Sequence, residues 1–276
     1  MTMIQMKQIG FGYKKQSVFR DFSLDIREGE TTLITGINGT GKTTLLRLMA
    51  GVLYPAKGKI EYAEKLGKNP REYIGFISDQ MRLYENMTLK KAMAFHSSVY
   101  GIESFDTELY EQTKLKLDKK ISELSVGQKM IFHLGLLIAA KPKILLIDEV
   151  IHAIDAYLRD IFLDRLLELI EERQITLVMV NLNFHDIERI PQRVILLRNG
   201  EIAVDASVEE LKANVKKIVA QEASLDLPVL YKRSFSDCNE FYIYPYEENG
   251  ELPTNAKVTD LNLHDIIKAF IGGEYV

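Results

Sequence analysis

Residues 36–43 read Gly36-Ile37-Asn38-Gly39-Thr40-Gly41-Lys42-Thr43, which matches the pattern G-x-x-x-x-G-K-[ST]. The run follows an apolar, strand-like stretch at residues 31–35 and precedes an apolar, helix-like stretch at residues 45–50. A glycine-rich turn in this context directs backbone N–H groups and the positive end of a helix towards phosphate. We therefore predict a nucleotide-phosphate loop, in which Lys42 contacts phosphate and the Thr43 hydroxyl binds Mg²⁺. The residues expected to contact the nucleotide are Gly36, Asn38, Gly39, Thr40, Gly41, Lys42, Thr43 and Thr44.

The composition limits the classes of protein to consider. The chain has 276 residues, 46% of them hydrophobic, and a formal net charge of −4. It has no long Lys/Arg cluster, which argues against a nucleic-acid partner. The single cysteine, Cys238, allows no intrachain disulfide and suits a reducing compartment. The longest apolar stretch, residues 134–140, is far shorter than the roughly 20 residues of a membrane helix, and residues 1–7 lack a signal-peptide core. We expect a chain that is soluble by itself and would need another subunit to span a membrane.

Strand-like and helix-like runs alternate through most of the chain, which predicts an α/β sheet with parallel strands at its centre. Residues 144–147 are apolar without alternation, as in a strand buried on both faces. Asn199-Gly200 is typical of a two-residue hairpin turn. The predicted fold class is α/β, a P-loop NTPase core of the RecA-like type with an antiparallel β edge. Strand patterns occur at 3–9, 22–26, 31–35, 59–62, 74–77, 144–147, 176–180 and 194–197, and helical patterns at 45–50, 128–140 and 157–173.

Two segments depart from this alternation. Residues 81–125 have mostly helical patterns broken by Gly101, which predicts a helical insertion and a helical subdomain at about 81–140. From residue 207 the pattern changes again, so we divide the chain into a nucleotide-binding domain, 1–206, and a small α+β C-terminal appendage, 207–276. The appendage is expected to contain a capping box at 207–210, strands at 227–231 and 240–244, and a helix capped by Asn262 and ended by Gly272 and Gly273.

Two adjacent carboxylates end the apolar run at 144–147. Because the carboxyl ends of parallel strands line the ligand crevice of such sheets, Asp148 and Glu149 are expected to face the phosphate loop. Asp148 can hold Mg²⁺ directly or through water, and Glu149 can orient and polarise an attacking water. The alternative is an exposed acidic pair at the start of a helix.

Further motifs resemble those of ATP-binding-cassette (ABC) ATPases. Residues 124–129, Leu124-Ser125-Val126-Gly127-Gln128-Lys129, resemble the Leu-Ser-Gly-Gly-Gln signature of that family and precede the acidic strand, as the family's signature does. The resemblance covers roughly residues 3–205, and the tail at 260–273 in addition resembles the bacterial export-type, ABC-2-like branch of the family. The other matching elements are Phe11-Gly12-Tyr13, Gln80 after Ile77-Ser78-Asp79, Ala153-Ile154-Asp155 and Gly200-Glu201-Ile202.

The resemblance implies a head-to-tail dimer with ATP and Mg²⁺ sandwiched between two subunits. Tyr13 would stack on adenine, and Gln80 would sense Mg²⁺. The implied catalytic residues are Glu149, Lys42 and Gln80, and the implied metal ligands are Thr43, Gln80 and Asp148. The residues implied to contact ATP held by the opposite chain are Ser125, Gly127, Gln128 and Asp155.

The same resemblance implies the partners and the location. A transmembrane permease subunit and a second ATPase subunit, identical or different, are expected, with the chain on the cytoplasmic, inner face of the cell membrane. Residues 260–273 resemble the end of export-type ATPases, so we expect ATP hydrolysis to power export. The transported substrate, the choice between homodimer and heterodimer, and the role of 207–276 stay open.

Two positions depart from the family pattern. Val126 replaces a signature glycine, and its branched side chain adds bulk and disfavours positive φ. Leu182 falls where the family usually has a histidine that contacts the γ-phosphate, and leucine makes no side-chain hydrogen bond. His185, Asn181 and Asn183 are candidate substitutes. His133, on the signature helix, is expected to be a packed or interface histidine rather than a ligand.

Three functions from different classes fit these motifs. The first is the ATPase subunit of a transporter. The second is a slow or degenerate cassette that mainly binds ATP and regulates or pairs with another ATPase subunit, as Val126 and Leu182 suggest. The third is a soluble ABC ATPase acting on nucleic acid, which the single cassette and the absence of sustained heptads disfavour.

Overall fold

The computed structural model describes residues 1–14, 16–78, 84–151, 154–180, 187–247, 252–253 and 255–272. Its central feature is a six-stranded sheet with the strand order β5-β6-β7-β3-β8-β9. The first five strands are parallel, and β9 runs antiparallel to β8. The strands are β3 (Thr31–Thr35), β5 (Ile74–Ser78), β6 (Ile144–Asp148), β7 (Thr176–Val180), β8 (Arg193–Arg198) and β9 (Glu201–Ser207).

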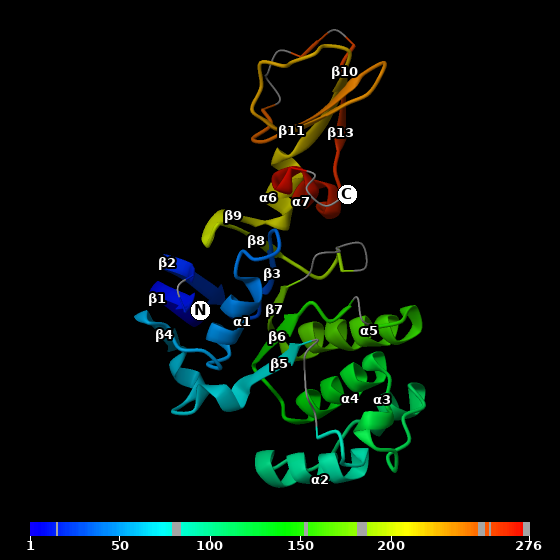
Figure 1. The fold of residues 1–276 in the computed structure, drawn as a ribbon. Helices are drawn as coiled ribbons and strands as arrows, with labels where there is room; N and C mark the ends of the chain where they lie inside the picture. The colour runs from blue at the N-terminus through cyan, green and yellow to red at the C-terminus, as the bar shows by residue number, and fades with distance from the viewer. Residues whose placement is uncertain are drawn as a thin grey trace.

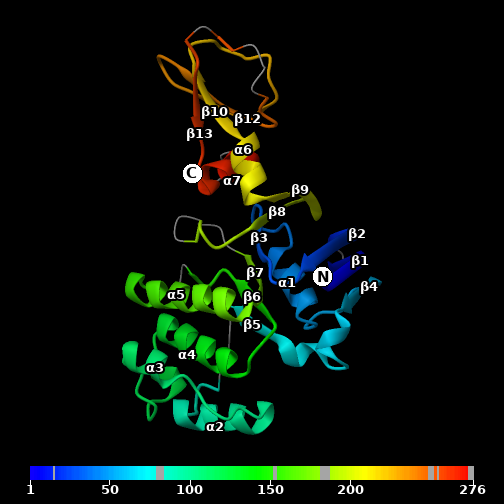
Figure 2. The same ribbon diagram turned by 180° about the vertical axis from the view of Figure 1, so that it is seen from behind.

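The sheet lies between two layers (Figures 1 and 2). On one side are α1 (Lys42–Met49) and an antiparallel three-stranded sheet of order β2-β1-β4. On the other side, α4 (Val126–Ala139) and α5 (Ala156–Arg173) cover the strands. Every residue of β3, β6 and β7 is buried, which explains their continuous apolar or threonine-containing sequences. The outer sheet consists of β1 (Thr2–Tyr13), β2 (Gln16–Arg27) and β4 (Lys57–Tyr62).

A helical region lies beyond α4, at the end of the molecule away from the C-terminal sheet (Figure 1). Its helices begin at side-chain caps, since Thr88 and Asp106 each accept a hydrogen bond from a backbone N–H in the first turn. Gly101 ends α2 in the left-handed conformation, as its role of helix breaker predicted. The elements are α2 (Leu89–Tyr100), α3 (Thr107–Gln112) and the 3₁₀ turn Ile121–Glu123; two other 3₁₀ turns, Glu64–Leu66 and Pro70–Tyr73, lie between β4 and β5.

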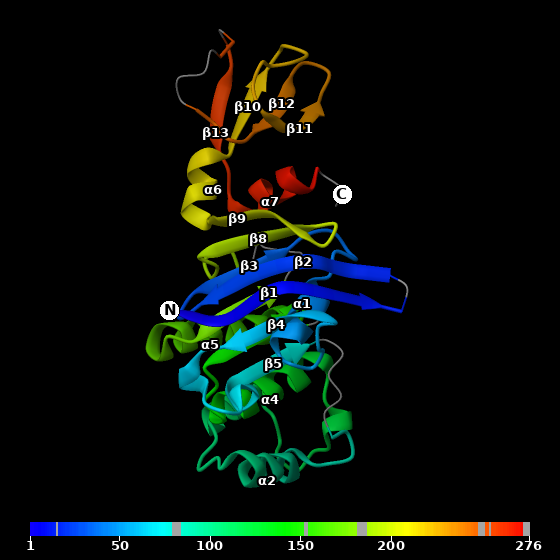
Figure 3. The same cartoon turned by 90° about the vertical axis from the view of Figure 1, so that its left-hand side faces the viewer.

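The C-terminal residues form two helices and a third sheet, with the order β11-β12-β10-β13 (Figure 3). This sheet has a small core of its own, formed around Ile218, Phe241 and Ile243. The helices instead share the main core, because Leu211, Ile267 and Phe270 belong to the same buried cluster as α4 and α5. The elements are α6 (Val208–Asn214), β10 (Lys216–Ala220), β11 (Val229–Ser234), β12 (Asn239–Ile243), β13 (Lys257–Asp260) and α7 (Leu263–Ile271).

Most local expectations are confirmed in the described residues. Asn199 and Gly200 form the two-residue turn between β8 and β9, both with positive φ. Asn262 caps α7, and Gly272 ends it in the left-handed conformation. The strands expected at 227–231 and 240–244 lie at β11 and β12, and β10 and β13 were not predicted. No helix in the described part of the chain is both long and apolar enough to cross a membrane.

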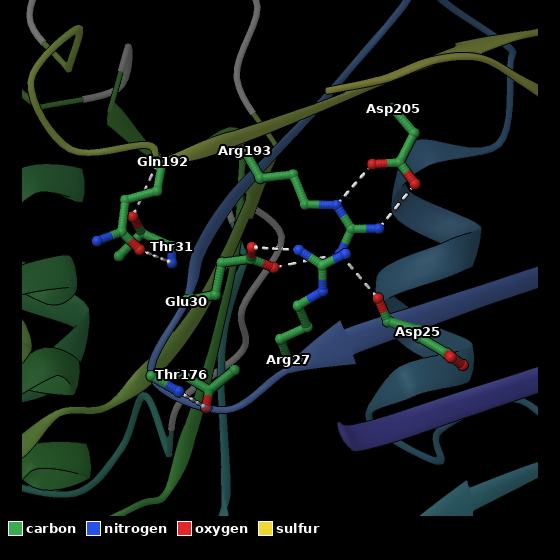
Figure 4. Close-up of polar contacts among 9 residues, drawn as sticks. Asp25, Arg27, Glu30, Thr31, Thr176, Gln192, Arg193 and Asp205 are labelled. Carbon is green, nitrogen blue, oxygen red and sulfur yellow. Dashed lines mark hydrogen bonds and ion pairs between the residues drawn. The ribbon is translucent and has the colours of Figure 1, made fainter. Parts of the chain in front are cut away.

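A polar network closes the edge of the central sheet where β3, β7 and β8 begin; we call it the amino edge (Figure 4). The guanidinium of Arg193 donates to both carboxylate oxygens of Asp205, at 2.6 and 2.7 Å, and to Glu30 at 3.2 Å. It also donates to the backbone carbonyl of Asp25 at 2.9 Å. These hydrogen bonds, above all those with Asp205, raise the pKa of Arg193 against the opposing effect of burial. The network ties β2, β8 and β9 to the turn before β3.

Candidate nucleotide-binding site

The phosphate-binding loop lies between β3 and α1, at the opposite edge of the sheet, which we call the carboxyl edge. Gly36, Gly39 and Gly41 all have positive φ, a conformation that glycine adopts without strain. Two of them also need the space that a missing side chain leaves. A Cβ at Gly36 would lie 2.3 Å from the carbonyl oxygen of Leu197, and one at Gly41 would lie 2.7 Å from Val18. The loop glycines are therefore required by backbone geometry before any ligand is considered.

Lys42, the first residue of α1, is buried, and its ammonium group turns back onto the loop. Its Nζ donates to the carbonyl oxygens of Gly36 at 2.8 Å and Ile37 at 3.2 Å. Burial lowers the pKa of Lys42, while the nearby carboxylates of Glu149 and Asp148 act in the opposite direction. The hydrogen bonds of this cation thus go to backbone carbonyls, which a phosphate could replace with stronger, charge-assisted bonds.

The expected metal ligands Thr43 and Asp148 are brought together across 105 residues of sequence. The Thr43 hydroxyl lies 3.0 Å from Oδ1 of Asp148, the last residue of β6. Both groups offer hard oxygen donors, and Mg²⁺ is typically held by one or two such protein oxygens together with waters and phosphate. The residues present therefore fit Mg²⁺ bound with a nucleotide. Among the described residues there is no group of three or more His, Cys, Asp or Glu side chains arranged as an independent metal site.

Glu149 follows β6 and has an unusual backbone. Its φ is 51°, in the left-handed region, and its N–H donates to the carbonyl of Val180 at 3.0 Å. Its carboxylate lies 3.8 Å from the ammonium of Lys42 and is one-third exposed. A non-glycine residue held in this region is often found at a functional site. The conformation places the Glu149 side chain on the wall of the loop cavity, where it can reach water.

A cavity of about 340 Å³ lies in front of the loop. Tyr13 forms part of its wall and is 45% exposed, so the ring is accessible from the cavity. The Tyr13 hydroxyl lies 3.4 Å from the Thr44 hydroxyl, and Phe11 supports the ring edge-on at 5.1 Å. Gln16 and Val18 also line the cavity and were not predicted, although Tyr13 pairs with Gln16 across the hairpin. The lining consists of Tyr13, Gln16, Val18, Asn38, Gly39, Gly41, Lys42, Thr43, Thr44 and Glu149.

The signature residues form a separate surface at the start of α4. Ser125 is the N-cap, and it forms a capping box with Gln128 through two 3.2 Å hydrogen bonds. Val126 is the first residue of the helix and is 50% exposed. The prediction that its branched side chain would conflict with a positive φ is wrong, because the backbone at Val126 is helical. The side chain is exposed, so its added bulk is accommodated at the surface.

Gly127 and Asp155 complete this second surface. A Cβ at Gly127 would lie 3.0 Å from Leu158, so a larger residue would push α4 away from α5. Asp155 caps α5 by accepting a hydrogen bond from the N–H of Leu158 at 3.1 Å. Within the described residues, none of the four signature-side positions lines the loop cavity. The loop cavity and the signature surface are therefore separate features of the described chain.

Several expected site residues lie outside the described part of the chain. These are Gln80, Asn181, Leu182, Asn183 and His185, so their roles remain predictions. His133, by contrast, is described and is buried in α4, where burial lowers its pKa to about 3. This agrees with the expectation of a packed histidine.

Comparisons with known proteins agree with this geometry. A family description named "ABC transporter" matches residues 19–152. The chain is 30% identical to the ABC transporter ATP-binding protein YtrB of Bacillus subtilis over 223 residues, covering 78% of this chain and 76% of that protein. It is 29% identical to the zinc-uptake ATP-binding protein ZnuC of Bacillus subtilis, over 73% of this chain and 93% of the relative. It is also 27% identical to the spermidine/putrescine import protein PotA of Haemophilus influenzae, over 98% and 80% of the two chains.

Solved structures show the same fold. An ATP-binding subunit of an ABC transporter superposes with a TM-score of 0.67 at 22% identity, over 76% of this chain and 92% of that one. The dimeric cassette MJ0796 bound to ADP and phosphate gives 0.63 at 21% identity, over 75% and 99%. The chain therefore belongs to the ABC transporter family, and it is an ATPase subunit of that family with a P-loop NTPase fold.

Proposed function

We propose that this chain binds and hydrolyses Mg²⁺-ATP for a transporter whose membrane-spanning part is a separate permease subunit. The observation that carries the proposal is the convergence of four groups at the carboxyl edge. The buried ammonium of Lys42 lies 3.8 Å from Glu149, and the Thr43 hydroxyl lies 3.0 Å from Asp148, beside a cavity walled by Tyr13. Lys42 would bind phosphate, Thr43 and Asp148 would hold the metal, and Glu149 would act as the base. Tyr13, on the cavity wall, would stack on the nucleotide base.

The chemistry follows from what each group can do. Phosphate would replace the loop carbonyls as the partner of Lys42, and the loop N–H groups would hold its other oxygens. Thr43 and Asp148 would hold Mg²⁺, whose charge would offset that of the phosphates. Glu149 would orient a water and accept its proton, since its carboxylate is accessible from the cavity and held near the loop by its backbone.

The separation of the two half-sites supports a head-to-tail dimer. Ser125, Gly127, Gln128 and Asp155 do not line the loop cavity of their own chain, so a second subunit would bring such a surface to the nucleotide. A two-fold arrangement satisfies both sites at once. The exposed N-terminus of α4 offers N–H groups and a favourable dipole to the γ-phosphate.

The direction and cargo of transport depend on the partner. The relatives with a stated direction are importers or uptake proteins for polyamines, zinc or sulfate. The export expected from residues 260–273 is therefore not supported by these relatives, and it is not part of the proposal. Relatives with different cargoes match this chain at similar identity, as expected if the membrane-spanning permease, and not the ATPase subunit on the cytoplasmic face, selects the cargo.

The decisive experiment is steady-state ATP hydrolysis by the purified chain and by Glu149→Gln. The amide cannot accept the proton, so turnover should fall by about 10²–10⁴-fold while ATP is still bound. Glu172→Gln, on the exposed face of α5, is the matched control and should leave turnover unchanged. Equal turnover of Glu149→Gln and the parent chain would show that another group activates the water.

The second candidate is a slow cassette that mainly binds ATP and pairs with a more active subunit. The leucine at 182, in place of the usual histidine, favours it. If that leucine limits the rate, Leu182→His should raise turnover at saturating ATP without changing ATP affinity. No increase would remove the main reason for this alternative.

A further inference from the structure

The end of α7 meets the core at the last residue of β8. Nη2 of Arg198 donates to the backbone carbonyl of Phe270 at 2.5 Å, across 72 residues of sequence. Phe270 lies in the final turn of α7, just before the left-handed Gly272. The last carbonyls of a helix lack partners within the helix and carry partial negative charge, so a guanidinium is well suited to this position. Figure 3 shows α7 lying along β8 and β9.

From Arg198 the contact continues directly into the phosphate-binding loop. Leu197 precedes Arg198, and its carbonyl oxygen abuts Gly36 so closely that no Cβ fits there. The carbonyl of Gly36 in turn accepts the 2.8 Å hydrogen bond from Lys42. The carbonyl of Phe270 is thus linked to the ammonium of Lys42 through one side chain and two short stretches of backbone.

The loop is open on this side. A second cavity, of about 380 Å³, is lined by Gly36 and Ile37 together with the end of β8 and the end of α7. It is distinct from the 340 Å³ cavity in front of the loop, which is lined by Asn38, Gly39 and Gly41. Because side chains do not fill this space, packing alone does not fix how far the loop start lies from α7. The hydrogen bond of Arg198 crosses the same boundary and can set that distance.

We propose that Arg198 is a positioning residue that couples α7 to the phosphate-binding loop, so that docking of α7 controls nucleotide affinity. The inference rests on the proposed ATP-binding function. With the contact intact, Gly36 and Ile37 hold Lys42 in place before nucleotide arrives. Without it, part of the binding free energy is used to order the loop. Bound phosphate then holds the loop itself, so affinity changes and turnover at saturation does not.

The test compares Arg198→Met, Arg198→Lys and the parent chain. Methionine keeps an unbranched apolar stem but removes the donors, and lysine keeps one cationic donor. Dissociation constants for Mg²⁺-ATPγS and the KM and kcat for ATP are measured on the full chain. Arg198→Met should raise Kd and KM by about three- to tenfold, the effect of one lost hydrogen bond, with kcat within about twofold. The Kd and KM of Arg198→Lys should lie between those of the parent chain and those of Arg198→Met.

Arg165→Met is the matched control, since Arg165 pairs with Asp106 and Glu168 on the helical side, away from the loop. A second approach comes from the helix: Gly272→Ala strains the left-handed end of α7 and should also raise Kd, by less. This variant decides the question if Arg198→Met fails to fold. Hydrogen exchange of the loop amides without nucleotide should be faster in both variants.

Parent-like Kd and loop exchange in Arg198→Met would overturn the inference, as would an equal loss in Arg165→Met. Failure of the proposed function gives a different result, because the parent chain itself would then neither bind nor hydrolyse ATP. A fall in kcat with unchanged KM would also contradict the inference, since it would place Arg198 in the chemical step.

Discussion

Each edge of the central sheet holds one buried cation, and the two cations differ in their partners and in the direction of their pKa shifts. At the amino edge, Arg193 has its partners within the chain, and its hydrogen bonds to Asp205 raise its pKa. At the carboxyl edge, Lys42 is as deeply buried but contacts mainly backbone carbonyls, and burial lowers its pKa. One edge completes its polar contacts when the chain folds. At the other, the Lys42 ammonium has backbone hydrogen bonds and one carboxylate at 3.8 Å, and this difference distinguishes the structural edge from the proposed functional one.

Breaking the carboxyl edge should have the largest effect. Lys42→Met removes the cation from the loop, and we expect ATP hydrolysis to fall by about 10²–10³-fold, as for loss of a preorganised electrostatic contact. The free energy of unfolding should change little, because removing the ammonium also removes its desolvation penalty. Lys68→Met, at an exposed lysine, is the control. Turnover within tenfold of the parent would mean that Lys42 does not contact the transferred phosphate.

Breaking the amino edge should have the reverse profile. Arg193→Met leaves Glu30 and Asp205 without their shared cation, and we expect a loss of about 3 kcal/mol in the free energy of unfolding, measured in urea. This value is at the low end for a buried pair, because the Asp205 side chain is 36% exposed. ATP affinity of the folded protein should stay within about twofold of the parent. A large loss of affinity with intact stability would instead assign the network to the nucleotide site.

His133 extends the comparison of Arg193 with Lys42, because it is a third buried basic side chain and lacks a carboxylate partner among the described residues. Burial lowers its pKa from 6.5 to about 3, with a smaller contribution from His96. The folded state therefore keeps His133 neutral while the unfolded state binds a proton below pH 6.5. Stability should be full above pH 6.5 and fall towards pH 3, by about 1.4 kcal/mol per pH unit well below 6.5.

The check is urea denaturation of the parent and His133→Leu between pH 7 and pH 5. The variant should lose less stability over this range than the parent, because it has no imidazole to protonate on unfolding. Parallel profiles would show that His133 does not control the acid side of the curve.

The smallest effect is expected at the rim of the amino edge. Arg27 pairs with Glu30 at 3.3 Å, but its side chain is 64% exposed. Arg27→Ala should therefore change the free energy of unfolding by no more than about 0.5 kcal/mol, because water and salt screen an exposed pair. A loss comparable to that of Arg193→Met would mean that the energy of the network is shared along the edge.

The carboxyl edge was the part of the site most accessible from sequence. The loop at 36–43 and the acids at 148 and 149 each occupy a few consecutive positions, and the rule that parallel strands end at one edge places them together. The hydrogen bond between Thr43 and Asp148 agrees with that placement. The positions of most central strands along the chain, the Asn199-Gly200 turn and the cap at Asn262 were predictable for the same reason, since each depends on short-range patterns.

The amino edge and the α7 contact were not predicted, because their partners are far apart in sequence. Arg193 bonds to Glu30 across 163 residues and to Asp25 across 168. A single arginine at the start of a strand gives no local signal of such a partner. The left-handed backbone of Glu149 was likewise hidden, since it depends on where the neighbouring strand ends. β10 and β13 were missed because both mix lysine with apolar residues in short runs.

The sharing of the main core by α7 has a consequence for how the protein is made. Leu263, Ile266, Ile267 and Phe270 are buried in the same cluster as α4 and α5, although α7 begins 90 residues after α5 ends. A nascent chain that has emerged only as far as β9 carries every loop and acid of the nucleotide site but still exposes the apolar surface that α7 covers. Until α7 has been synthesised and has packed against the core, this surface can bind chaperones or aggregate. Because the same helix also reaches Arg198, the arrival of α7 would mark the point in biosynthesis at which the phosphate-binding loop becomes ready for nucleotide.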